Sequence, residues 1–131
     1  MRVDVRRLRF PARPLLVWDA LFELAVGLAL LVPLSPARSW LLLPDRTSSA
    51  LGIVFLVAAA GIAALLLQDP PSPTAVRALG WGNLLGGAAG WLLLIVLWSR
   101  FSAYGRASLG SAADICLLLG VLELLSTERP R

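Results

Sequence analysis

Long runs of apolar residues, separated by short polar or proline-containing segments, dominate the pattern along this chain. Four of these runs are each about 20 residues long, the length of α-helix that crosses a hydrocarbon core of about 30 Å. In lipid a helix satisfies all of its own backbone polar groups, so each run predicts a transmembrane helix. The predicted spans are 15–32, 50–67, 74–98 and 103–125.

The segments between the spans predict how the helices are connected. Residues 35–49 contain Trp40 and three leucines between polar flanks, which is too short to span, so this segment is predicted to lie in the membrane interface. Asp69 is followed by three prolines in four positions, which cannot continue a helix. The predicted fold is all-α: a membrane-embedded four-helix bundle with a short interfacial segment between the first two helices.

Composition supports one membrane domain over residues 1–131. Hydrophobic residues make up 58% of the chain and charged residues only 15%, more apolar surface than a soluble domain of this length can bury. The first apolar run is longer than a signal-peptide core and contains Asp19 and Glu23, so it is predicted to be retained as a helix.

The distribution of arginine predicts the orientation. All twelve basic residues are Arg, and eight of them fall on the side of the N-terminus: Arg2, Arg6, Arg7, Arg9, Arg13, Arg77, Arg129 and Arg131. Four fall on the other side, so the positive-inside rule places both termini, including the tails 1–13 and 126–131, in the cytoplasm of a plasma-membrane protein. The Arg-rich start is predicted to contact anionic lipid headgroups. No basic patch interleaved with aromatic residues follows it, as a nucleic-acid surface would need, so no nucleic-acid partner is expected.

The absence of histidine restricts the chemistry. With no His and a single cysteine, Cys116, the chain cannot form Ser-His-Asp or Cys-His catalytic groups, an intrachain disulfide or the usual Cys/His zinc sites. We therefore expect no catalytic residue, metal site or cofactor.

Carboxyl groups inside the predicted spans are the candidate functional residues, because charge near the bilayer centre is costly. They are Asp19, Glu23, Asp114 and Glu123. In one interpretation these acids form hydrogen bonds that hold the bundle together. Arg13 would then partner Asp19, and Arg77 would partner Glu123.

The second interpretation is an intramembrane proton or cation site. Glu23 and Asp114 fall near the middle of their spans, with Asp19 and Asn83 as further candidate members. Glu23 lies about 12 Å into the first span at 1.5 Å per residue, and no Arg lies at that depth. Glu23 is therefore predicted to be protonated at neutral pH.

A glycine pattern in the third span predicts close helix packing. Gly82, Gly86 and Gly90 recur every four residues, which leaves one stripe of the helix without side chains. Asn83 is expected to hydrogen-bond across this contact.

Three short sequences resemble those of DoxX-like proteins, a loose group of small bacterial four-helix membrane proteins. They are Trp18-Asp19-Ala20-Leu21-Phe22, Arg77-Ala78-Leu79-Gly80-Trp81-Gly82-Asn83 and Tyr104-Gly105-Arg106-Ala107. The resemblance implies a four-helix bundle in the plasma membrane and carries no activity. The chain is also similar in size to small multidrug-resistance transporters, in which Glu23 would match an acid of the first helix; the long Arg-rich start and the segment 35–49 depart from that family.

Two functions are therefore expected from the sequence. The first is a non-enzymatic accessory or interaction protein that partners the lipid bilayer and either a second copy of itself or another membrane protein. The alternative is a proton-coupled transporter of small solutes that uses Glu23 and Asp114.

Overall fold

The computed structural model describes residues 11–127, which are helical with no strand in that range. The long helices are α1 (Ala12–Leu31), α3 (Asp45–Leu66), α4 (Pro73–Val96) and α5 (Ala103–Ser126), with a short α2 (Pro36–Leu41) and a 3₁₀ turn η2 (Trp98–Arg100) between them. Over residues 11–127, these four long helices are long and apolar enough to cross a membrane. The predicted all-α, four-helix class is confirmed, and the chain is a multi-pass membrane protein.

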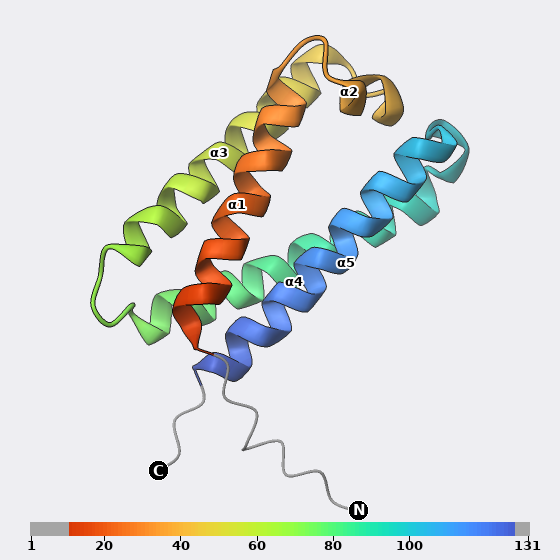
Figure 1. Ribbon diagram of the computed structural model, residues 1–131. Helices are drawn as coiled ribbons and strands as arrows, with labels where there is room; N and C mark the ends of the chain where they lie inside the picture. The colour runs from red at the N-terminus through yellow and green to blue at the C-terminus, as the bar shows by residue number, and fades with distance from the viewer. Residues whose placement is uncertain (1–10, 128–131) are drawn as a thin grey trace, which may run out of the picture.

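The four long helices form two antiparallel hairpins (Figure 1). α1 packs along α3, and α4 packs along α5. Contacts between the hairpins are made mainly on α5, by α1 and by α2. The start of α1 and the end of α5 lie at the same end of the bundle, as four crossings require.

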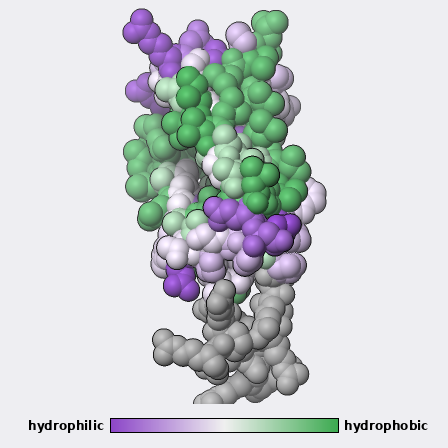
Figure 2. All heavy atoms as spheres, turned by 90° about the vertical axis from the view of Figure 1, so that its left-hand side faces the viewer, coloured by the Kyte–Doolittle hydropathy of each residue, from purple (hydrophilic) through white to green (hydrophobic). Residues whose placement is uncertain are grey.

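The surface carries a wide apolar zone between two polar ends. Figure 2 shows hydrophobic side chains over the middle of the face that it views, with hydrophilic residues above and below. Exposed large apolar residues occur on all four long helices, among them Leu21, Val54, Leu92 and Leu118. This distribution fits helices whose outer surfaces face lipid.

The second long helix begins earlier than the sequence predicts, at Asp45 instead of residue 50. Pro44 precedes the helix and accepts a 2.9 Å hydrogen bond from the Ser48 amide. Asp45 in the first turn complements the positive end of the helix dipole. A polar first turn can extend beyond the apolar zone, so the interfacial helix between the first two spans shortens to α2.

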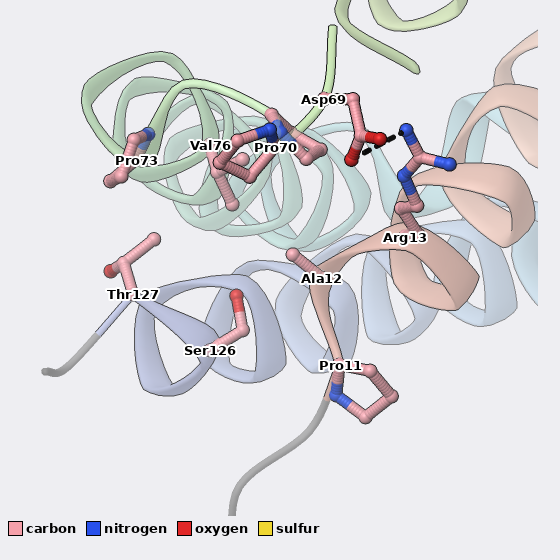
Figure 3. Close-up of a pocket in the computed structure, with 10 residues that line it drawn as sticks. Pro11, Ala12, Arg13, Asp69, Pro70, Pro73, Val76, Ser126 and Thr127 are labelled. Atoms are coloured by element: carbon pink, nitrogen blue, oxygen red, sulfur yellow. Dashed lines mark ion pairs between the residues drawn. The ribbon is translucent and has the colours of Figure 1, made fainter. Parts of the chain in front are cut away.

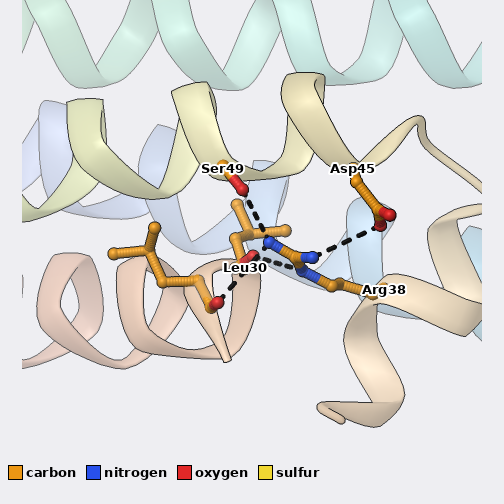
Figure 4. Close-up of polar contacts among 5 residues, drawn as sticks. Leu30, Arg38, Asp45 and Ser49 are labelled. Atoms are coloured by element: carbon orange, nitrogen blue, oxygen red, sulfur yellow. Dashed lines mark hydrogen bonds and ion pairs between the residues drawn. The ribbon is translucent and has the colours of Figure 1, made fainter. Parts of the chain in front are cut away.

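Arg38 holds the connection between α1 and α3 (Figure 4). Its Nε donates to the Leu30 carbonyl at 2.7 Å and its Nη2 to the Ser49 hydroxyl at 2.8 Å, while Nη1 lies 3.3 Å from the Asp45 carboxylate. The last carbonyls of a helix have no intrahelical partner, and a guanidinium satisfies them while complementing the negative helix end.

At the same end of the bundle, α2 connects the first hairpin to the start of α5. The Trp40 ring stacks on Tyr104 with 5.7 Å between ring centroids. The Ser102 hydroxyl donates to the Trp40 carbonyl at 2.7 Å and accepts from the Gly105 amide at 3.0 Å, which caps α5. Trp40 therefore has a structural contact in addition to the interfacial location expected for it.

Glycines allow α4 and α5 to approach closely. A Cβ atom placed on Gly87 would lie 2.7 Å from the Ala113 carbonyl oxygen, and one on Gly120 would lie 2.7 Å from the Gly80 carbonyl oxygen. Both distances are shorter than real Cβ contacts, so these positions accept only glycine without backbone movement. The tight contact is thus made by Gly80, Gly87 and Gly120.

This finding corrects the glycine stripe that the sequence predicts. A Cβ on Gly82 or Gly86 would have nothing within 4 Å among the described residues. Only Gly90 of that stripe faces α5, with 3.1 Å from an added Cβ to the Ala113 Cβ. Glycines occur on two faces of α4. The spacing of four residues pointed to the face of Gly82 and Gly86, which points away from the other described helices, whereas Gly80 and Gly87 lie on the face that meets α5.

Candidate functional site

A cluster of polar side chains lies in the interior between the two hairpins. Asp19 and Glu23 come from α1, Asn83 from α4 and Glu123 from α5. Asp19 and Glu123 are completely buried, and Glu23 and Asn83 are each 6% exposed. Asp19 and Glu23 share one face of α1, because residues four apart differ by only about 40° around a helix.

Asn83 is the centre of this cluster. Its side-chain NH₂ donates to the Asp19 Oδ2 at 3.0 Å and to the Glu123 Oε2 at 3.0 Å. One amide group therefore connects three helices and both hairpins. The prediction that Asn83 hydrogen-bonds across a helix contact is confirmed. The contact lies on the face of α4 that carries Gly80 and Gly87, and the partners of Asn83 are two acids.

The second carboxyl oxygens of the cluster, Asp19 Oδ1 and Glu123 Oε1, are buried and have no hydrogen-bond donor among residues 11–127. Leu16 and Val76, nearly inaccessible to solvent, belong to an apolar core that lies toward the end of the bundle where the chain enters. Buried carboxyl oxygens without donors are costly, so the bundle keeps this cluster at the expense of stability.

Arg13 and Arg77 do not neutralise these carboxyls, contrary to one of the expectations from the sequence. Arg13 lies 3.3 Å from the Asp69 carboxylate and donates to the Gln68 carbonyl at 3.0 Å. Arg77 is exposed on α4. Asp19 and Glu123 instead share a neutral amide, and the depth argument that paired them with Arg13 and Arg77 fails because those guanidinium groups turn toward the surface.

Asp114 does not join Glu23. Its carboxyl accepts a 2.9 Å hydrogen bond from the Trp91 indole nitrogen and the residue is exposed. Asp114 and Glu123 are nine residues apart on one helix, which places them about 180° apart around its axis. The expected Glu23–Asp114 pair is therefore replaced by Asp19, Asn83 and Glu123, with Glu23 one turn further along α1.

A pocket of about 370 Å³ opens at the end of the bundle below this cluster. Figure 3 shows the Arg13–Asp69 ion pair on one side of it, with Ser126 and Thr127 on the other. Val76 lines the pocket and precedes Asn83 by seven residues on the same face of α4, about 10 Å along the axis. Water at this end is therefore separated from the cluster by an apolar layer.

Across residues 11–127, no three His, Cys, Asp or Glu side chains converge as metal ligands would. Cys116 is a free, half-buried cysteine. Comparisons with known protein families, curated proteins and solved structures found no match to this chain. The site must therefore be interpreted from its own geometry, and the likeness to DoxX-like proteins stays a prediction.

Sequence reasoning did not place Glu123 in the candidate proton or cation site. Its position near the end of the fourth span favoured a structural hydrogen bond, with Arg77 as a partner at comparable depth. A usable signal was present: Gly120 and Glu123 are three residues apart, so the helix face that packs most closely also carries the acid.

Proposed function

We propose that the protein is a non-enzymatic interaction protein of the plasma membrane that assembles through the outer face of α5. The observation that carries this proposal is the exposed carboxyl of Asp114, about halfway along a membrane-spanning helix. Its hydrogen bond from Trp91 satisfies one oxygen only. A carboxyl group facing lipid at this depth is costly, and a second helix packed over it would remove that cost.

Neighbouring positions on α5 have the composition of a helix interface. Ala107, Ser111, Asp114 and Leu118 are all exposed and follow one another at intervals of four, three and four residues. This is the spacing of a left-handed helix pair, and small and polar residues are typical of contacts between membrane helices. We name these four residues the α5 seam.

The occupant that we propose for the α5 seam is a second copy of the chain. Copies inserted in the same orientation place identical residues at the same depth, so a two-fold axis along the membrane normal would bring Asp114 beside Asp114 and Ser111 beside Ser111. Two carboxyl groups can pair in this way when they share a proton, whereas a lipid tail offers neither donor nor acceptor.

Cysteine cross-linking in native membranes tests the proposal. In a Cys116→Ala background, Ser111→Cys should form a disulfide-linked dimer on mild oxidation, and Asp114→Leu should lower its yield severalfold. The matched control is Val54→Cys, because Val54 is 62% exposed on the outer face of α3 and should remain monomeric. Equal cross-linking at both positions, or none at Ser111→Cys, would contradict assembly through the α5 seam.

Cytoplasmic termini are part of the same proposal. The four arginines assigned to the outside include Arg38, which binds the end of α1, and Arg106, whose Nε donates to the Trp98 carbonyl at 3.0 Å and whose Cζ lies 4.5 Å from the Trp98 ring centroid. These two have local structural roles that account for their presence on that side. The excess of arginine on the other side therefore supports the positive-inside orientation.

A further inference from the structure

The bond pattern around Asn83 contains more carboxyl oxygens than donors. Asp19 and Glu123 both accept from the same Asn83 amide nitrogen, each at 3.0 Å, so their two carboxyl groups lie next to each other. Two ionised carboxylates have only acceptor atoms and repel at such a distance. A hydrogen bond between them requires a proton on one of the two.

Among residues 11–127, no positively charged group lies beside the pair to compensate two negative charges. On α1 the neighbouring titratable group is Glu23, and on α5 it is Cys116, which lies close enough to interact electrostatically with all three acids. α4 contributes Asn83 from its buried face and directs Arg77 outward. The charged residues of α3, Asp45 and Arg46, lie at its far end.

The Asp19–Glu123 pair lies between the two hairpins, so a change in its charge affects the contact between them. Asp19 belongs to the first hairpin, while Asn83 and Glu123 belong to the second. The long helices pack tightly within each hairpin and make few contacts between hairpins, which come from α1 and α2 against α5. The Asp19–Asn83–Glu123 group is therefore a polar contact between α1 and the second hairpin, beside the apolar contact of Leu16 with Val76.

We propose that Asp19 and Glu123 form a proton-binding site that latches the two hairpins together. With one proton on the pair, the carboxyls hydrogen-bond to each other and to Asn83. When that proton leaves to water, two adjacent carboxylates remain and repel, and α1 separates from α5. The route to water is the pocket beneath Val76 and Leu16, so release requires those apolar residues to move apart. This inference is independent of assembly through the α5 seam.

The experiment follows the proton and the hairpins in the same sample. The full chain in lipid nanodiscs, with Cys116→Ala, Val54→Cys and Leu92→Cys, carries one spin label on the exposed surface of each hairpin. As pH rises, an infrared band of protonated carboxyl should disappear and the label distance should lengthen with the same midpoint. This measurement requires no change in the site itself.

Variants assign the effect to the pair. Glu123→Gln and Asp19→Asn keep hydrogen-bonding capacity and shape, and each should abolish the pH dependence of the label distance and remove the titrating band. Asp45→Asn, which changes an exposed carboxyl at the far end of α3, should leave both unchanged. A band that persists in Glu123→Gln and Asp19→Asn, a wild-type distance that is constant with pH, or an equal loss in Asp45→Asn would each overturn the latch.

Discussion

At the residue scale, Asn83 is the side chain on which most polar contacts of the interior depend. A single amide satisfies one oxygen each of Asp19 and Glu123. Its own burial would be unfavourable without those two partners. The buried asparagine therefore depends on the two acids for its hydrogen bonds, and each acid depends on the asparagine for its donor.

Replacing Asn83 should show this dependence directly. Asn83→Leu removes both hydrogen bonds and leaves two further buried carboxyl oxygens without donors, so the free energy of unfolding should fall by about 2–6 kcal/mol at 1–3 kcal/mol per lost partner. Asn83→Gln keeps the amide and should lose less. Reversible unfolding in mixed detergent micelles, followed by helical circular dichroism, measures both; equal losses would mean that packing at this position matters and the amide does not.

At the scale of helices, the α4–α5 contact depends on which glycine face meets the partner. Gly86 and Gly87 are adjacent in sequence, yet an added Cβ meets nothing at Gly86 and lies 2.7 Å from the Ala113 carbonyl oxygen at Gly87. Neighbouring residues on a helix differ by about 100° around its axis. Two glycines with the same local sequence environment therefore have different structural roles.

This pair gives a matched test of the packing. Gly87→Ala should destabilise the protein by about 1–3 kcal/mol, the usual effect of overpacking, because the nearest atoms are backbone. Gly86→Ala should be neutral or slightly stabilising, since alanine is the better helix former by about 1 kcal/mol. Thermal unfolding of the two variants under the same conditions measures the difference in their stability. A larger loss for Gly86→Ala would place the close contact on the face that the sequence first indicated.

At the scale of the whole molecule, the ends of the bundle differ in their polar groups. One end has the entry of α1, the exit of α5 and the Arg13–Asp69 ion pair. The other has α2, the Arg38 contacts and the Ser102 cap of α5. With four crossings, the start of α1 and the end of α5 face one compartment, and the arginine distribution supports our proposal that this compartment is the cytoplasm.

Reporter fusions test this orientation. A reporter placed after Arg131 and one inserted between Asp69 and Pro73 should both be active in the cytoplasm, whereas one inserted at Asp45 should report the outer side. Deleting the five N-terminal arginines should weaken the bias because they supply most of the charge difference. A C-terminal reporter active on the outer side would reverse the assignment.

The sequence by itself determined the number of spans, their lengths to within a few residues and the helical class, because a hydrocarbon core fixes how many apolar residues a helix needs. It also identified Asp19, Glu23 and Asn83 as residues whose placement in a span requires a reason. Its prediction of α3 began late because the polar first turn at Asp45 extends beyond the apolar zone.

Only the tertiary structure decided which helix faces meet. In a soluble helix the apolar stripe marks the buried side, but here the faces toward lipid and toward protein are both apolar, so periodicity along the chain does not distinguish them. The sequence therefore favoured Asp114 over Glu123 for the candidate site, although Asp114 faces outward beside Trp91 and Glu123 faces Asn83. The rotation of each helix about its axis, set by close approach at Gly87 and Gly120, separates these two acids.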